Sequence, residues 1–130
     1  MEDMLQETKK SNPVSSQTLP VKDTLKIVTD LAELLREHKG QDVCIIDIRT
    51  INNWTDFFII TTASSNVHID GLERHIKDYC NENNIDILGC SRRSTDDEWR
   101  LMDLGFTIIH LMNRRSREFY DLERLWRAVT

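Results

Sequence analysis

The stretch EWRLMDLGFTIIHLMNRRSREFYDLERLW, residues 98–126, decides the fold of this chain. Side chains at 99–103 alternate between two faces, which is the period of a strand. The pair at 104–105 contains glycine, which takes positive φ easily, and predicts a tight reversal. A second apolar run over 106–112 predicts another strand. After a basic break, four apolar residues recur at helical spacing and predict one closing helix: Phe119, Leu122, Trp126 and Val129.

Upstream of this stretch, the hydrophobic pattern alternates between helical and strand periods. The expected elements are a helix over 23–39, strands over 42–49 and 56–62, a helix over 66–83 and a short strand over 85–88. Residues 43–46 are apolar on both faces, so we expect their strand in the centre of the sheet. The short linker after it predicts an antiparallel neighbour, and the strand–helix–strand unit predicts a parallel, right-handed crossover. The pattern indicates a small α/β domain.

The length of 130 residues fits one domain, which needs no disulfide or metal to be stable. Residues 1–21 are polar, contain both prolines and lack an apolar period, so we expect a disordered or loosely attached segment. The folded domain is expected over 22–130. A partner-binding tail is the alternative for the first segment.

Charge and cysteine usage narrow the class of protein. The net charge of −5 gives no global attraction to nucleic acid and suits a basic protein partner, although mild acidity is also common in cytosolic proteins. Three cysteines without CxxC spacing favour a reducing compartment. No secretory signal or membrane-length apolar run is present in the sequence. We therefore expect a cytoplasmic protein with no membrane partner.

Three carboxylates are the candidates for chemistry. Asp47, Asp56 and Asp103 lie on or beside expected strands, and carboxylates on neighbouring strands can hold magnesium for nucleotidyl transfer. However, the Gly-Ser turn and Asp-x-Asp pair of that chemistry are absent, and each residue has an ordinary strand-edge explanation. The four histidines lack metal-ligand spacing, and His110 reads as a hydrogen-bonded structural residue. We expect no enzyme, cofactor or metal site.

Several motifs resemble the ribosomal silencing factor family, also called RsfS or Iojap. They are Gly40-Gln41-Asp42, Thr55-Asp56, Thr62-Ala63-Ser64-Ser65, Asp103-Leu104-Gly105, His110, Ser116-Arg117, Tyr120, Leu122-Glu123 and Leu125-Trp126. The resemblance spans nearly the whole expected domain. It implies a mixed, roughly five-stranded α/β sheet with flanking helices, with a topology similar to nucleotidyltransferases.

The resemblance also implies a function. Such a protein binds the large ribosomal subunit through ribosomal protein L-fourteen and sterically blocks the small subunit, which represses translation under nutrient limitation, for example in stationary phase. Organelle relatives act in large-subunit assembly, and that role is the alternative, followed by a nucleotidyltransferase-like enzyme. The polar segment 90–98, which contains Arg92 and Arg93, is expected to be a solvated hairpin loop, and contact of these arginines with ribosomal RNA is the alternative. A homodimer is a further expectation from the resemblance.

By match to the family motif, five residues are the expected partner contacts: Trp99, Asp103, Leu104, Arg117 and Tyr120. Trp99 stands among charged residues beside an acidic loop, so we expect a half-exposed anchor whose replacement by alanine spares the fold and weakens binding. An ordinary core tryptophan is the alternative, and it predicts loss of stability instead.

Overall fold

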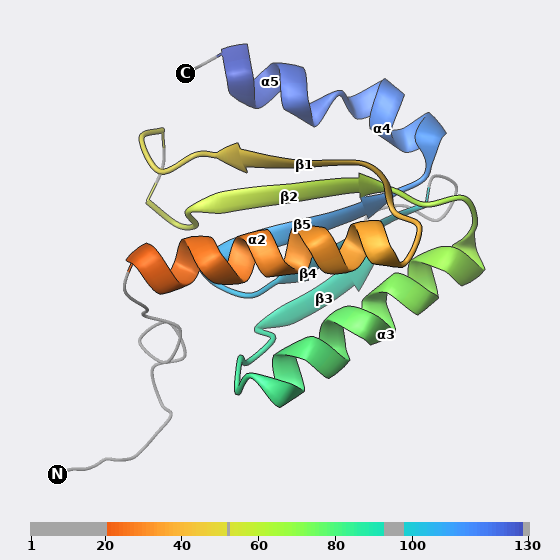
Figure 1. The fold of residues 1–130 in the computed structure, drawn as a ribbon. Coiled ribbons are helices and arrows are strands. Elements are labelled where there is room, and N and C mark those ends of the chain that lie inside the picture. The colour runs from red at the N-terminus through yellow and green to blue at the C-terminus, as the bar shows by residue number, and fades with distance from the viewer. Residues whose placement is uncertain (1–20, 52, 93–97, 129–130) are drawn as a thin grey trace, which may run out of the picture.

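The structure is a computed structural model that describes residues 21–51, 53–92 and 98–128 (Figure 1). Its elements are α2 (Val21–Glu37), β1 (Gln41–Asp47), β2 (Phe57–Thr62), α3 (Asn66–Glu82), β3 (Gly89–Arg92), β4 (Trp99–Asp103), β5 (Thr107–Met112), α4 (Arg114–Tyr120) and α5 (Leu122–Ala128). Residues 1–20 lie outside the described part, so disorder of the first segment stays a prediction.

The strands form one mixed five-stranded sheet in the order β1-β2-β5-β4-β3. β2 and β5 are parallel, whereas β1–β2, β5–β4 and β4–β3 are antiparallel. The predicted fold class, an α/β sheet with flanking helices, is confirmed. The predicted parallel relation across α3 is also confirmed, because two successive antiparallel pairings beyond β5 leave β3 parallel to β2. The similarity to nucleotidyltransferases stays a prediction.

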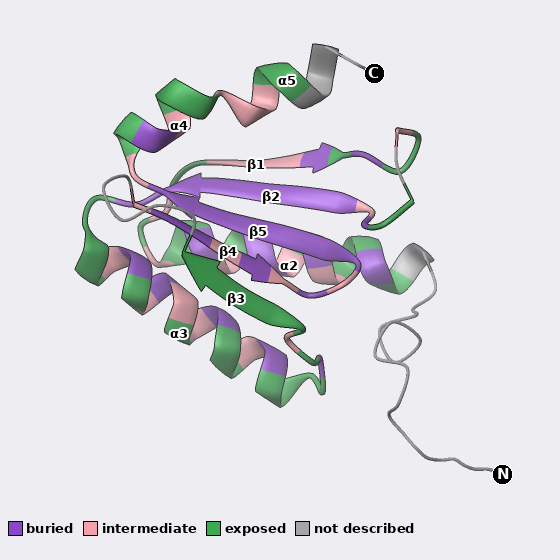
Figure 2. Cartoon of the chain, turned by 180° about the vertical axis from the view of Figure 1, so that it is seen from behind, coloured by how far each residue is buried: buried purple, intermediate pink, exposed green. Residues whose placement is uncertain are grey.

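The sheet has a different hydrophobic core on each face. Helices α2 and α3 lie on one face of the sheet (Figure 1). Phe57 and Ile59 of β2 belong to the larger core on that face. The alternate residues of β2, Phe58 and Ile60, point to the other face and join a second core with Trp99. Both central strands, β2 and β5, are buried along their whole length (Figure 2). Helices α4 and α5 lie on this other face, where α4 contacts β5, α5 contacts β1, and Leu122 of α5 packs against the second core.

Strand β1 lies at the edge of the sheet, so its predicted central place is wrong. Val43, Cys44 and Ile45 are only half-buried. They are apolar on both faces because α2 packs against one side of the strand and α5 contacts it from the other. An edge strand flanked by helices therefore shows the same residue pattern as a central strand.

Two further predictions about elements are wrong. Residues 85–88 are not a strand, and β3 begins only at Gly89, where all four residues of the strand are exposed (Figure 2). The closing helix is two short helices, because Asp121 takes the left-handed conformation with φ 47° and ψ 53°. Short polar side chains such as aspartate tolerate that conformation. Val129 lies outside the described residues.

Ser65 and Gly105 determine the local structure around them, as their side-chain and backbone chemistry predicts. Ser65 caps α3 and its side chain accepts a hydrogen bond from the backbone N–H of His68 at 3.1 Å. Gly105 has φ 90°, and its N–H donates to Asp103 Oδ1 at 2.8 Å. That turn joins β4 to β5 and confirms the predicted reversal. On α2, the apolar side chain of Leu25 is exposed.

Two glycines are expected to respond oppositely to alanine. A Cβ at Gly40 would lie 2.6 Å from Thr61 Oγ1 and 2.8 Å from the backbone oxygen of Leu35. Gly40→Ala should lower the free energy of unfolding by about 1–3 kcal/mol, because backbone atoms cannot yield cheaply. A Cβ at Gly71, inside α3, meets only Arg74, at 3.8 Å. Gly71→Ala should stabilise by about 0.5–1 kcal/mol through helix propensity. Urea denaturation measures both, and equal effects would contradict the packing around Gly40.

Candidate partner-binding surface

Trp99 is a buried residue and not the half-exposed anchor that the sequence suggested. It is 8% exposed and belongs to the second core. Its indole Nε1 donates a hydrogen bond to His110 Nδ1 at 3.1 Å, from the neighbouring strand β5. Tryptophan burial with a satisfied N–H is the usual arrangement in a core. The structural role predicted for His110 is confirmed, since the residue is 4% exposed and its ring is hydrogen-bonded to Trp99.

An aromatic stack leads from this core to the surface. The Tyr120 ring packs on Trp99 with 4.6 Å between ring centroids, and Phe119 meets Tyr120 edge-on at 4.9 Å. Exposure rises along the stack, to 39% at Tyr120 and 75% at Phe119. We call Trp99, Tyr120 and Phe119 the aromatic stack. Its outer two members, at the end of α4, are side chains that a partner protein can reach.

Arg117 fastens helices α4 and α5 to the sheet. Its guanidinium donates two hydrogen bonds to the Glu123 carboxylate, at 3.0 and 2.7 Å. It also donates to Thr62 Oγ1 at 3.0 Å and to the backbone oxygen of Gln41 at 3.3 Å. Burial alone lowers the pKa of Arg117, but the hydrogen bonds and charge of Glu123 outweigh it and raise that pKa overall. With its side chain 11% exposed, Arg117 has its donors directed into the protein.

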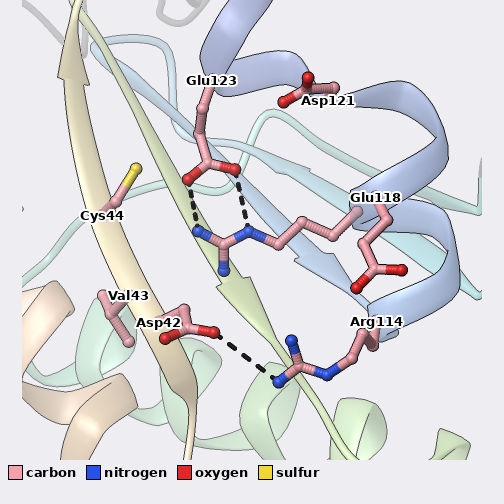
Figure 3. Close-up of a pocket in the computed structure, with 8 residues that line it drawn as sticks. Asp42, Val43, Cys44, Arg114, Glu118, Asp121 and Glu123 are labelled. Carbon is pink, nitrogen blue, oxygen red and sulfur yellow. Dashed lines mark hydrogen bonds and ion pairs between the residues drawn. The ribbon is translucent and has the colours of Figure 1, made fainter.

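A cleft of about 450 Å³ lies between β1 and the α4–α5 corner (Figure 3). It is lined by Asp42, Val43, Cys44, Arg114, Arg117, Glu118, Asp121 and Glu123. The two arginines are already engaged, Arg117 with Glu123 and Arg114 with the side chain of Gln41 at 3.0 Å. The lining therefore combines four carboxylates with two arginines that already have hydrogen-bond partners.

Asp103 and Leu104 lie at the opposite end of strand β4 from Trp99. Leu104 is completely buried, and its N–H donates to Thr107 O in the turn. The carboxylate of Asp103 holds the same turn through Gly105. Asp103 lies four residue steps along the strand from Trp99, which is roughly 13 Å at the usual rise. The structure therefore brings together Trp99, Arg117 and Tyr120, and leaves Asp103 and Leu104 apart from them.

Phe119 is the surface residue that the sequence reading missed. Helical spacing placed it on the inward stripe of one long closing helix, but the break at Asp121 ends α4 directly after Tyr120. Phe119 is thereby left facing solvent. The signal was the Tyr-Asp-Leu sequence, since an aspartate between two apolar residues can end a helix in the left-handed conformation.

The candidate carboxylates do not form a metal site. No group of three or more potential ligands comes together among the residues that the structure describes. Asp47 is exposed at the end of β1 and accepts hydrogen bonds from Arg49, which hold the pKa of Asp47 below its ordinary value. The local explanation for Asp47 is confirmed.

Arg92 is exposed at the end of β3, whereas Arg93 lies outside the described residues. No described helix is long and apolar enough to span a bilayer.

Comparisons with known proteins agree on one family. The family model described as "Ribosomal silencing factor during starvation" matches residues 21–130. The ribosomal silencing factor RsfS of Haemophilus influenzae is 33% identical over 102 residues, covering 78% of this chain and 99% of that protein. The RsfS of Treponema pallidum is 31% identical, with 74% and 86% covered. A mouse protein named for mitochondrial assembly of the ribosomal large subunit is 32% identical and covers 74% of this chain, while the match spans 43% of the mouse protein.

Solved structures agree with the sequence comparisons. A crystal structure of a protein from Chromobacterium violaceum superposes with a TM-score of 0.72 and 27% identity, covering 83% of this chain and 87% of that one. Another, from Bacillus halodurans, gives a TM-score of 0.66 at 25% identity, with 78% and 94% covered. These relatives carry the names of ribosomal factors and not of enzymes where a function is named. Because the family model spans the whole described fold, the chain belongs to the ribosomal silencing factor family, RsfS or Iojap.

Proposed function

We propose that this protein binds ribosomal protein L-fourteen on the large ribosomal subunit and thereby blocks association with the small subunit. The observation that carries the proposal is the match of the silencing-factor family model to residues 21–130. The exposed end of the aromatic stack on this same domain supports it, because aromatic side chains are enriched at protein interfaces. On this proposal the protein acts in the cytoplasm and represses translation when nutrients run low.

The mechanism is steric occlusion and needs no covalent chemistry. An interface of standard size buries about 800 Å² on each partner, which is enough to exclude the small subunit if it overlaps a contact between subunits. Ribosomal proteins are basic, and this chain carries a net charge of −5. Electrostatic attraction should therefore speed association, and that acceleration should weaken as salt rises.

The contact residues divide into two groups on this proposal. Tyr120 is exposed enough to touch the partner directly, and Asp103 is half-exposed. The other three residues have little exposed surface and act by holding the exposed contact residues in position; they are Trp99, Leu104 and Arg117. Trp99 is the platform for Tyr120, and Arg117 holds the helix that carries it.

A role in large-subunit assembly is the second candidate. The mouse relative that is 32% identical is named for that process. Both roles use binding to the large subunit, so they differ in what the bound protein prevents. An assembly factor associates with immature particles and leaves joining of mature subunits unaffected, whereas a silencing factor stops it.

A subunit-joining titration separates these roles. Purified mature subunits are mixed with increasing protein, and joined ribosomes are followed by light scattering. The proposal predicts loss of joining at protein concentrations that saturate the large subunits, and a return of joining as salt weakens binding. Binding without loss of joining would contradict silencing and favour assembly.

The fraction of protein that self-associates is measured in the same buffer by analytical ultracentrifugation, which tests the expected homodimer.

A further inference from the structure

We infer that Phe119 is the anchor of this protein on its ribosomal partner, and that the facing surface of the partner is a protein surface with an apolar site and a basic rim. This inference rests on the proposed binding to the large subunit. The inference adds Phe119, which lies outside the family motif, to the proposed contact residues. It also states the chemistry of the partner surface that Phe119 would contact.

Phe119 buries little of its ring within its own domain. It is 75% exposed, and its described ring contact is the edge of Tyr120. Burying an aromatic side chain removes about 150–250 Å² of mostly apolar surface from water and dominates the energetics of many interfaces. Val67 is similarly exposed, at 79%, but it is a smaller side chain and makes no stack with a buried aromatic ring. Phe119 is therefore the most exposed of the large side chains described on α4 and α5, ahead of Leu125 at 57% and Tyr120 at 39%, and the first that binding would bury.

The surroundings hold Phe119 in place before any partner binds. Asn113 caps the start of α4 by accepting a hydrogen bond from the backbone N–H of Ser116 at 2.8 Å. At the other end, the N–H of Asp121 donates to Arg117 O at 2.9 Å. Arg117 in turn ties the helix to Thr62, and Tyr120 rests on buried Trp99. A side chain presented from a fixed helix loses little conformational entropy on binding, which favours a role as anchor.

The charges beside Phe119 favour a basic protein as the occupant. Glu118 is exposed and pairs with no cation among the described residues. Asp121 lines the adjacent cleft (Figure 3). The arginines of that cleft are occupied: Arg117 by Glu123, and Arg114 by Gln41, with Asp42 at 3.7 Å. Two carboxylates therefore remain at the rim for lysine or arginine of a partner. Arg115, one turn before Phe119, is the group that an RNA would use instead.

Four variants of the full chain test the inference by co-sedimentation with large subunits. Phe119→Ala should weaken binding at least about tenfold, because truncation of an anchor is costly. The matched control is Leu25→Ala, an exposed apolar side chain on α2, on the opposite face of the sheet, which should bind as the unchanged protein does. Glu118→Lys should weaken binding several-fold at low salt, and the loss should shrink as salt rises. Arg115→Gln should leave binding unchanged or strengthen it.

The outcomes are separable from those of the proposed function. If the unchanged protein does not bind large subunits, the proposed function fails. If it binds and Phe119→Ala binds equally well, the inference alone is overturned. Stronger binding by Glu118→Lys together with weaker binding by Arg115→Gln would mean that this corner faces RNA, which also overturns it. Circular dichroism melts of each variant must match the unchanged protein, as expected for exposed positions.

Discussion

Trp99→Ala should lower the free energy of unfolding by about 3–5 kcal/mol, the usual cost of emptying a buried tryptophan site. Trp99 is 8% exposed, and the indole hydrogen bond to His110 would be lost together with the ring contact to Tyr120. For a domain with about 5–15 kcal/mol of total stability, this is a large fraction. The stability loss replaces the expectation, drawn from the sequence, that this variant keeps its fold.

Chemical denaturation followed by circular dichroism measures the change. Trp54→Ala is the matched control, because Trp54 is 56% exposed in the connector between β1 and β2, and it should cost less than about 1 kcal/mol. Trp99→Phe keeps most of the ring packing and removes the N–H, so an intermediate loss of about 1–2 kcal/mol is expected. A Trp99→Ala protein as stable as the unchanged chain would contradict the burial of Trp99 and would support the expectation of a half-exposed anchor.

Arg117→Ala should destabilise the domain by about 3 kcal/mol. The change removes both hydrogen bonds to Glu123 and those to Thr62 and Gln41, so the Glu123 side chain, which is 25% exposed, loses both hydrogen bonds from the guanidinium. Hydrogen exchange should rise most in α4 and α5, since Arg117 fastens this corner to the sheet. Denaturation in urea measures the total loss, and exchange with mass spectrometry locates it.

A double-mutant cycle distinguishes this support role from direct contact with a partner. Arg117→Ala with Glu123→Ala should lose less stability than the sum of the single variants, because the hydrogen bonds between these two side chains can be lost only once. Arg117→Lys should restore only part of the stability, since lysine cannot make the two-pronged contact with Glu123. Arg117→Ala with unchanged stability and weaker subunit binding would show that the guanidinium meets the partner instead.

Elements with strong local signals were predictable from the sequence. Ser65 begins α3 and Gly105 makes the β4–β5 reversal, because capping and positive φ depend on the residue itself and its immediate neighbours. The place of β1 in the sheet was not predictable. Strand order is set by pairings between distant segments, and an edge strand covered by helices has the composition of a central one.

The candidate surface was predictable only in part. The family motif pointed to Trp99, Arg117 and Tyr120, which do lie at one end of the sheet. It did not give their exposure, because Trp99 is buried by side chains from other strands and hydrogen-bonded to His110, eleven positions along the chain. It also did not give Phe119, whose exposure follows from the left-handed conformation of a single residue, Asp121.

The most direct test of the account is a binding titration of the purified full chain against isolated large and small ribosomal subunits. Labelled protein is sedimented with each subunit at low and at physiological salt, and the bound fraction is fitted. The account predicts saturable binding to the large subunit, near one protein or one dimer per particle, and none to the small subunit. Absence of binding to the large subunit at low salt, or equal binding to both subunits, would contradict it.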